Sequence, residues 1–323
     1  MIVITGGAGF IGSALAWKLN ELGHTDLLIV DQEAEGSAKW DNVRKKSFSA
    51  YFESGHFLDS LEAGRIRDVL AVFHMGACSD TTQTDALFLA ANNTLYTRRI
   101  AEWCLSNGVY LAYASSAAVY GDGARGFSDD DALAPKLKPL NLYGQSKLDF
   151  DVWAIHRGVH KAVTGFRFFN VYGPNEYHKG HMRSVTHKGF EQVRDTGRLK
   201  LFKSYKKEYP DGGQKRDFLY VKDCVEAMVW FWKNPQEKGI YNLGAGRAET
   251  WNDLARALFK AMDKPAAIDY IEMPANLKNQ YQYFTEADLT KLRAAGCPTE
   301  FRNLERGVED YVKNYLAGSD PYL

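Results

Sequence analysis

The sequence predicts an α/β protein with a Rossmann-type, doubly wound parallel sheet and a smaller second α/β domain. Its first half alternates short apolar runs with helical patterns, which is typical of βαβ units. Those runs are continuously apolar, as expected of strands buried on both faces. A glycine-rich turn, TGGAGFIG (5–12), separates the first run from the first helical stretch.

The predicted elements follow this alternation along the chain. In the first half we expect strands at 2–5, 27–30, 69–74, 109–116 and 162–170, and helices near 10–22, 84–107 and 143–158. After residue 170 the alternation of strands and helices is less regular. We expect strands at 200–202, 216–221 and 240–244 and helices near 181–195, 250–262, 286–295 and 302–316. The polar, glycine-containing stretch 203–215 predicts a surface loop.

Composition excludes several classes of function. The 323 residues carry 40 Lys plus Arg and 40 Asp plus Glu, so the chain as a whole does not attract nucleic acid or an anionic membrane. Four cysteines without a Cys-x-x-Cys pair fit a reducing cytosol. The start, MIVITGG, lacks a basic n-region, and no apolar run approaches the ~20 residues of a membrane span. We expect a soluble, cytoplasmic protein.

The histidines do not predict a metal site. His156 and His160 are four residues apart, but the segment HRGVH lacks the glutamate of a zinc-binding helix. Surface or packing positions are the simpler interpretation of these side chains.

The glycines of the first turn have the spacing of a dinucleotide-binding loop. Gly6, Gly9 and Gly12 lie directly between a predicted strand and a predicted helix. Glycine there permits a tight turn and close approach of the backbone to a pyrophosphate, and the helix N-terminus favours an anion. Asp31 closes the second strand, where a carboxylate can accept hydrogen bonds from the adenosine ribose. A plain tight turn is the alternative, which this context disfavours.

The choice between NAD and NADP stays open on these residues. Asp31 would repel a 2′-phosphate, which favours NAD. Lys39, in the following loop, could neutralise that phosphate, or it could be an ordinary solvated lysine.

Three further residues have the types of a hydroxyl-oxidising site. Tyr143 and Lys147 are four residues apart in a predicted helix, so they share one helix face. A nearby ammonium favours the phenolate and lowers the phenol pKa from its ordinary value of ~10. Ser116 ends a predicted strand at the sheet edge where ligands bind in doubly wound folds, and its hydroxyl can donate to a substrate oxygen. An exposed helix pair and a strand-end cap are the plain alternatives.

Together these features resemble the extended short-chain dehydrogenase/reductase family, over essentially the whole chain. The segments ASSAAVYG (114–121) and FNVYGP (169–174) are similar to that family's sheet-edge segments. Dehydratases of the family have an Asp-Glu pair after the catalytic hydroxyl, whereas this chain has Ala117 and Ala118. The resemblance therefore implies oxidation and reduction of a nucleotide sugar without dehydration.

Four segments narrow the resemblance to the family of ADP-L-glycero-D-manno-heptose 6-epimerases. They are HMGACSDTT (74–82), NEYHKG (175–180), QKRDFLYVKD (214–223) and YFTEADLTKLRAAG (283–296). That family serves lipopolysaccharide-core precursor synthesis in Gram-negative bacteria. The resemblance implies an ADP-sugar substrate, tightly held NADP rather than NAD, and a homo-oligomer, typically a pentamer.

The same resemblance gives a function to Lys179. Epimerisation removes a hydride from a carbinol carbon and returns it to the other face of the resulting ketone. One acid/base serves one orientation of the hydroxyl, so a second is needed for the other. The resemblance makes Lys179 that second group, opposite Tyr143, with His181 near the substrate and His178 in a structural role.

Other positions carry over one at a time. Implied cofactor contacts are Gly6, Gly9, Phe10, Ile11, Gly12, Asp31, Gln32, Lys39, Met75, Gly76, Ala77, Cys78, Ser79, Asn92, Tyr143, Lys147, Val171 and Lys179. Implied substrate contacts are Ser116, Asn170, His181, Lys188, Phe202, Lys203, Ser204, Tyr205, Arg216 and Tyr281. Arg216 suits a pyrophosphate because its planar fork donates bidentately.

These assignments predict two domains, one that binds the cofactor and one that binds mainly the substrate. We expect residues 1–169, with 216–245 returning to them, to form the NADP-binding Rossmann domain, and 170–215 with 246–323 to form mainly the substrate-binding domain. Departures from the family pattern lie in the loop around Lys39, at Glu53 and in the long 203–215 loop. The alternatives are another nucleotide-sugar epimerase or reductase, such as a UDP-hexose 4-epimerase, and a non-catalytic NADP-binding regulator.

Overall fold

A seven-stranded parallel sheet forms the centre of the larger part of the molecule, and its strand order is β3-β2-β1-β4-β5-β6-β10. The structure, a computed structural model, describes residues 1–32, 36–274, 278 and 281–323. The strands are β1 Ile2–Thr5, β2 Leu27–Asp31, β3 Ala50–Glu53, β4 Ala71–His74, β5 Tyr110–Ser116, β6 Thr164–Phe168 and β10 Gly239–Leu243. This architecture confirms the predicted doubly wound fold.

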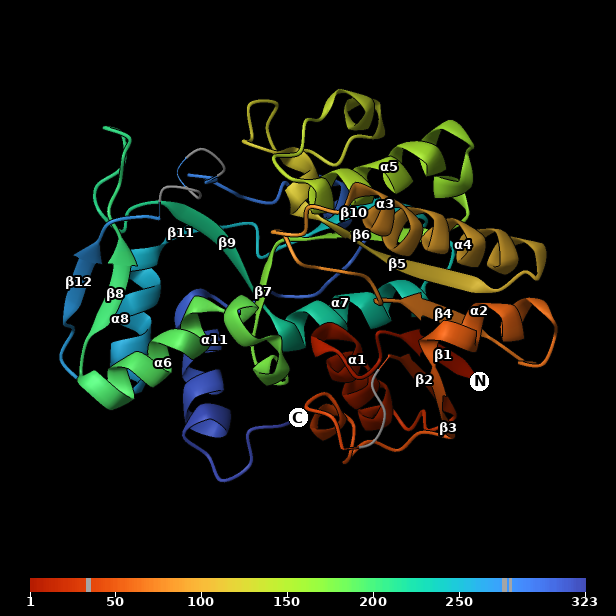
Figure 1. Cartoon of the computed structure of the whole chain (residues 1–323), viewed down its shortest axis with the longest axis horizontal. Helices are drawn as coiled ribbons and strands as arrows, with labels where there is room; N and C mark the ends of the chain where they lie inside the picture. The colour runs from red at the N-terminus through yellow and green to blue at the C-terminus, as the bar shows by residue number, and fades with distance from the viewer. Residues whose placement is uncertain (33–35, 275–277, 279–280) are drawn as a thin grey trace.

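Helices cover both faces of this sheet (Figure 1). Residues of β1 alternate between the two layers: Ile2 and Ile4 pack with helices α1 and α7, whereas Val3 packs with α2, α4 and α5. The helices are α1 Phe10–Glu21, α2 Ser54–Glu62, α3 Ala86–Leu89, α4 Tyr96–Ser106, α5 Leu142–His156 and α7 Val221–Lys233. The strand order reverses between β1 and β4, the point where ligands bind in such sheets.

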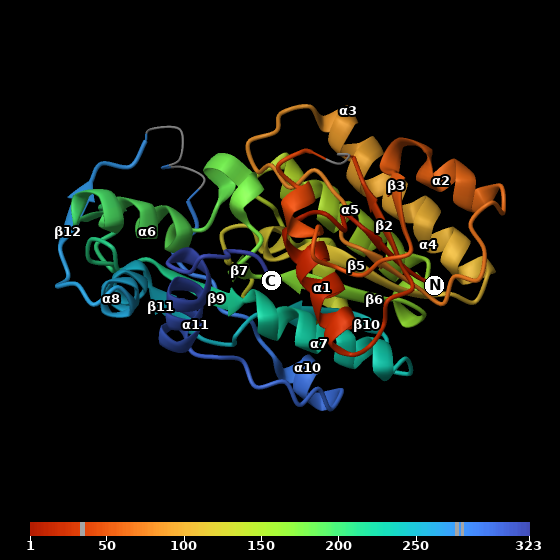
Figure 2. The same ribbon diagram turned by 90° about the horizontal axis from the view of Figure 1, so that it is seen from below.

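A smaller set of elements packs at one end of the molecule around its own core (Figure 2). It contains a three-stranded sheet, β11-β9-β7, and a parallel pair, β12-β8. The strands are β7 Asn170–Tyr172, β8 Leu199–Phe202, β9 Lys215–Tyr220, β11 Ala248–Thr250 and β12 Ile268–Ile271. The helices are α6 Val185–Thr196, α8 Trp251–Ala261 and α11 Leu304–Tyr311. Helix α10, Thr290–Ala294, packs instead on the core of the seven-stranded sheet. Among the residues that the structure describes, no helix combines the length and apolarity needed to cross a bilayer.

Short helical segments complete the chain. The 3₁₀ segments are Trp40–Asn42, Ala117–Tyr120, Asp131–Lys136, Val159–Lys161 and Tyr177–Met182, and the π segments are Ala90–Leu95 and Val312–Leu316. The predicted helix near 84–107 is therefore three segments, α3, a π turn and α4.

The sequence missed β3, α2, α7, β11 and β12. β3 and β12 lack a continuously apolar run because they lie at sheet edges with partly exposed residues. α7 begins at Val221 directly after β9, with no turn residue to mark the boundary. The predicted strand 162–170 ends earlier, because Phe169 donates to the Leu243 carbonyl and the chain then enters the smaller sheet as β7. The helix predicted at 286–295 shortens to α10.

Candidate active site

The glycine loop packs backbone against backbone. Gly6 has φ 62°, and a Cβ there would lie 2.7 Å from the Gly76 nitrogen, while a Cβ at Gly12 would lie 2.2 Å from the Gly6 carbonyl oxygen. The N-cap of α1 is Gly9, which has no side chain to accept from the first helical turn, and that turn carries no acidic residue. Helix amides without a side-chain cap suit a pyrophosphate, so the loop fits a dinucleotide cofactor.

An ion pair lies beside this loop, at the end of β2. Asp31 is buried and accepts from the Ala8 amide at 3.1 Å and the Gln32 amide at 2.8 Å. The Lys39 ammonium lies 3.1 Å from the Asp31 carboxylate, while Gln32 is exposed. The structure thus brings Lys39 to the end of β2, and a ligand arriving there meets a partly neutralised carboxylate.

Ser116, Tyr143 and Lys147 meet where β5 ends and α5 begins. Asn141 caps α5 by accepting from the Gly144 amide, which fixes the helix start two residues before Tyr143. Burial raises the pKa of the Tyr143 phenol, and a hydrogen bond with the Ser116 side chain opposes that rise. The Ser116 hydroxyl also accepts from the Ala118 amide at 3.1 Å. The predicted trio is therefore brought together.

Lys147 is buried, and its ammonium donates to the Ala114 carbonyl at 2.7 Å. Burial lowers its pKa to about 8, while Asp151 acts in the opposite direction. A lysine whose pKa is lowered to about 8 can exchange a proton more readily than a solvated lysine, and Lys147 lies one helical turn after Tyr143.

The loop after β4 is held against α5 by a residue that sequence reasoning missed. Asn93 is buried, and its amide accepts from the Cys78 amide and donates to the Cys78 carbonyl and the Ser146 hydroxyl. Cys78 lies close enough to Tyr143 and Lys147 to influence both pKa values. The neighbouring Asn92, which we expected to contact the cofactor, donates to Asn93. No local pattern distinguishes the two asparagines.

Residues 175–181 lie beside the glycine loop. The Lys179 ammonium lies 5.3 Å from the centre of the Phe10 ring, within cation–π range. The His178 ring contacts the Asn42 amide at 3.0 Å, and Asn42 donates to the Ala8 carbonyl. His181 influences the pKa of Asp80 in the loop after β4. A segment far along the chain therefore meets both cofactor-side loops.

Glu176, a buried residue to which the sequence assigned no role, lies close enough to influence the pKa of Lys179. Burial lowers the pKa of Lys179, Lys188 adds to the lowering, and Glu176 opposes it. The Glu176 carboxylate is buried and accepts from the Ser184 hydroxyl at 2.7 Å. Lys188 donates to the His181 carbonyl at 3.1 Å. A lowered pKa leaves a larger neutral fraction than an ordinary lysine has, which suits Lys179 to exchange a proton.

Arg216 lies in a second cluster, lined by aromatic rings. Its guanidinium lies 5.0 Å from the Tyr281 ring centre and 5.7 Å from that of Trp251, and it donates to the Lys215 carbonyl. Phe202 packs edge-on against Tyr281. Within the described residues Arg216 forms no ion pair, and burial lowers its pKa. A buried, unneutralised guanidinium among rings suits a phosphate and a planar base.

The rest of the predicted substrate set is more dispersed. Lys203 and Tyr205 both contact Glu272 at the β8–β12 rim, and Ser204 accepts from the Lys206 amide. Asn170 and Val171 begin β7.

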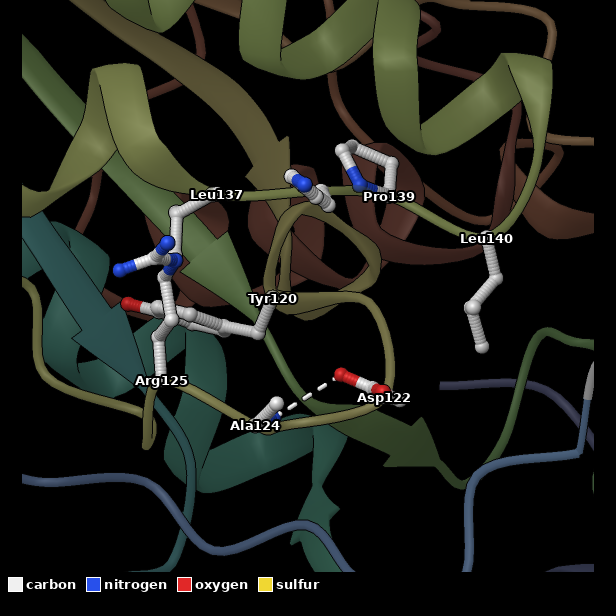
Figure 3. A pocket seen from close by; sticks show the side chains of 8 residues that line it. Tyr120, Asp122, Ala124, Arg125, Leu137, Pro139 and Leu140 are labelled. Carbon is white, nitrogen blue, oxygen red and sulfur yellow. Dashed lines mark hydrogen bonds between the residues drawn. The ribbon is translucent and has the colours of Figure 1, made fainter.

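A cavity of about 620 Å³ lies between residues 120–125 and 137–140 (Figure 3). No sequence pattern predicted it. Among the described residues, no group of three His, Cys, Asp or Glu side chains is placed to hold a metal ion.

A dinucleotide-type glycine loop at the switch point, with serine, tyrosine and lysine at the adjoining strand end, defines a Rossmann-type enzyme of hydroxyl oxidation and reduction. The model of the NAD dependent epimerase/dehydratase family matches residues 2–244. Proteins named ADP-L-glycero-D-manno-heptose-6-epimerase from Nitratidesulfovibrio vulgaris and Fusobacterium nucleatum are 52% and 47% identical, over 100% of both chains in each case. The chain therefore belongs to the NAD dependent epimerase/dehydratase family, among its ADP-L-glycero-D-manno-heptose-6-epimerases.

Solved structures agree with this placement. The Helicobacter pylori ADP-L-glycero-D-manno-heptose-6-epimerase superposes with a TM-score of 0.79 and 26% identity, covering 97% of this chain and 95% of that one. The Thermus thermophilus UDP-glucose 4-epimerase, solved with NAD, shares the fold with a TM-score of 0.76 at 24% identity, covering 98% and 99% of the two chains. The resemblance drawn from the sequence and the prediction of an epimerase are confirmed.

Proposed function

We propose that the protein inverts C6 of the heptose in ADP-D-glycero-β-D-manno-heptose to give ADP-L-glycero-β-D-manno-heptose. The route is transient oxidation of the C6 carbinol to a ketone, followed by reduction on the other face. The observation that carries this proposal is Lys179, a half-buried lysine of lowered pKa that lies beside the cofactor loop on a different element from Tyr143.

Tyr143 serves one orientation of the C6 hydroxyl. When bound, a nicotinamide dinucleotide supplies the hydride acceptor and, in the return step, the hydride donor. As the carbinol hydride leaves, Tyr143 takes the hydroxyl proton, Lys147 stabilises the phenolate, and Ser116 donates to the substrate oxygen. The Ser116–Tyr143 contact supports this assignment of roles.

Lys179 serves the opposite orientation. After the ketone forms, the C6 portion turns in the site and presents its other face to the same nicotinamide. Lys179 then donates a proton to the oxygen as the hydride returns, and it accepts that proton when the reaction runs backwards. A lowered pKa increases the fraction of Lys179 that is neutral and able to accept.

The ADP portion is assigned to the aromatic cluster around Arg216. We expect Arg216→Ala to raise KM for the ADP-sugar by roughly 10- to 150-fold, because a charge-assisted contact of ~1.5–3 kcal/mol is lost. Cofactor content should not change. Arg256→Ala, which removes an exposed arginine bonded to Asp253 on α8, is the control. An unchanged KM in Arg216→Ala would remove this residue from the pocket.

The activity itself is tested without added cofactor. Purified protein is incubated with ADP-D-glycero-β-D-manno-heptose, and inversion at C6 is followed by NMR. Turnover of a UDP-hexose with no inversion of the heptose would favour the UDP-hexose 4-epimerase alternative. Binding of nucleotide without turnover of either sugar would leave the non-catalytic regulator.

For the cofactor we propose NADP, held through every cycle. The Asp31–Lys39 pair supports it, because Lys39 can meet a 2′-phosphate whose repulsion by Asp31 it already reduces. Denaturing the purified protein and weighing the released nucleotide tests this proposal. Recovery of NAD alone would mean that Asp31 governs the choice, in line with the NAD found in the Thermus structure.

The remaining expectations are proposals of the same kind. We propose a cytoplasmic homo-oligomer, of five copies by family resemblance, whose Rossmann domain binds the cofactor and whose smaller domain binds mainly the sugar nucleotide. Light scattering of the purified protein measures the number of copies, and a monomeric mass would contradict the proposal.

A further inference from the structure

The C-terminal segment Asp320–Leu323 runs back to the cofactor side of the molecule. Both ribbon views place the chain end beside α1 (Figures 1 and 2). There the segment lies between two other segments, residues 41–46 after β2 and residues 175–177 before Lys179. Its contacts with both are specific and polar.

The first set of contacts is with residues 41–46. Lys45 forms an ion pair with Asp320, and Lys46 donates to the backbone oxygen of Leu323. The Arg44 guanidinium lies 5.5 Å from the centre of the Tyr322 ring. Three consecutive basic side chains thus hold one short segment on the cofactor side.

The second set is with the loop that carries Lys179. Tyr177 donates to the Pro321 carbonyl at 2.5 Å, and its ring meets that of Tyr322 edge-to-face at 5.1 Å. The Leu323 amide donates to the Asn175 side chain at 3.0 Å. The segment therefore joins residues 41–46 to residues 175–177, and the relative position of these two regions decides whether Lys179 faces the cofactor.

Asn175 completes the link to the glycine loop. It is fully buried, has φ 75°, and donates to the Ser13 hydroxyl at 3.0 Å. Ser13 in turn donates to the Phe10 carbonyl, and the Phe10 ring is the one under Lys179. A strained backbone at a buried asparagine persists only where its surroundings hold it, as the Ser13 and Leu323 bonds do here.

We propose that Asp320–Leu323 is a positioning segment for Lys179, which clamps loop 175–181 against the cofactor side through Asn175 and Tyr177. This inference rests on the proposed function, because it assigns the segment to one of the two proton-transfer orientations. The cluster around Ser116, Tyr143 and Lys147 shares none of these contacts. Weakening the clamp should therefore impair one half of the reaction and spare the other.

The test measures oxidation of each C6 epimer separately. Protein holding its oxidised cofactor is mixed with one epimer at a time, and the single-turnover rise in reduced nicotinamide is recorded. Lys179→Met first identifies the epimer that depends on Lys179. Tyr322→Ala should then slow oxidation of that epimer roughly 10- to 100-fold, as misplacement of a reacting group does, and leave the other unchanged. Deletion of residues 320–323 should do the same.

Three comparisons separate positioning from general damage. Tyr322→Phe keeps the ring contacts with Tyr177 and Arg44, loses only the long 3.4 Å hydrogen bond to Asp41, and should retain the wild-type rate. Tyr270→Phe removes an exposed hydroxyl bonded to Asn252 and is the matched control. In a Lys179→Met background, Tyr322→Ala should not slow oxidation of the Lys179-dependent epimer any further, because the side chain that Tyr322 positions is already absent.

The outcomes are distinct. Equal slowing of both epimers by Tyr322→Ala, slowing that follows loss of bound cofactor, or full rates for both epimers would overturn the positioning role. Wild-type protein that oxidises neither epimer would instead refute the proposed function. If the deletion variant does not fold, Tyr322→Ala alone decides.

Discussion

The two candidate acid/base groups are held in different ways. Tyr143 lies in the first turn of α5, where main-chain hydrogen bonds and the Asn141 cap fix it relative to Lys147, one turn further along. Lys179 lies in a 3₁₀ segment interrupted at Gly180, and its position depends on side chains from distant parts of the chain. The first site is built by local structure and the second by tertiary contacts. The second should therefore be the easier one to disturb without unfolding the protein.

The largest expected effect comes from removing each group in turn. Tyr143→Phe and Lys179→Met should each lower epimerisation by about 10²–10⁴-fold, because both proton transfers are needed for inversion. On a truncated substrate with an aldehyde at C6, each variant should retain one stereospecific half-reaction. Product stereochemistry and bound cofactor are measured together, with Lys200→Met, at an exposed position on β8, as the control.

Two results would break this comparison. Full epimerisation in Lys179→Met would return the lysine to the status of a solvated loop residue. Loss of activity that is wholly explained by lost cofactor would make Lys179 a cofactor ligand and leave the second acid/base unidentified.

The difference between the two sites also decides what the sequence could predict. Strand-turn-helix patterns and the i, i+4 spacing gave the glycine loop, Ser116, Tyr143 and Lys147, because those depend on local periodicity. The function of Lys179 came from family resemblance alone. Asn175 begins the segment NEYHKG but was given no role, since its partners Ser13 and Leu323 lie 162 and 148 residues away. Contacts at such separations leave no local pattern to follow.

Two adjacent serines on β5 provide a matched pair of variants for the site around Tyr143. Both serines contact α5 but at different turns: Ser115 donates to the buried Asp151 carboxylate, whereas Ser116, at the end of the strand, contacts Tyr143 in the first turn. Ser116→Ala should slow turnover about 10²-fold by removing a donor to the substrate oxygen. Ser115→Ala should keep its rate and lose ~1–3 kcal/mol of stability in urea unfolding, because Asp151 loses a bond. Equal rates in the two variants would exclude Ser116 from the chemistry.

Burial of the charged Lys147 side chain should lower the stability of the folded protein. Its pKa falls from 10.5 to about 8 on folding, so between those values the folded protein holds fewer protons than the unfolded chain, and stability rises with pH. Below pH 8 the buried charge costs roughly 3 kcal/mol, at about 1.4 kcal/mol per pH unit.

Lys147→Met should therefore be inactive but more stable by up to about 3 kcal/mol at pH 7, with a smaller gain near pH 10. Urea unfolding at the two pH values measures both. Lys233→Met, which replaces an exposed lysine at the end of α7, should change neither activity nor stability. A destabilised Lys147→Met at pH 7 would show that the bond to Ala114 outweighs the burial of the charge.

The smallest expected effect tests the anchor of the tertiary site. Glu176 accepts from the amides of Gly173 and Ser184 and from the Ser184 hydroxyl, and so joins the two ends of the loop that carries Lys179. Glu176→Gln keeps the shape but turns an amide donor toward one of those donors, which should cost ~1–3 kcal/mol of stability. Oxidation of the Lys179-dependent epimer should slow, while that of the Tyr143-dependent epimer should not.

The pH dependence of this loss has a definite sign. Burial raises the pKa of Glu176 above 4.5 despite the bonds from Ser184. The folded protein therefore holds more protons than the unfolded chain in the window above pH 4.5, and the contribution of Glu176 to stability is largest at low pH and falls as the pH rises through the folded value. The destabilisation by Glu176→Gln should accordingly shrink as the pH rises above 4.5 in urea unfolding. A loss that grows with pH would mean that the ionised carboxylate is the stabilising form, and that the loop is held by charge rather than by shape.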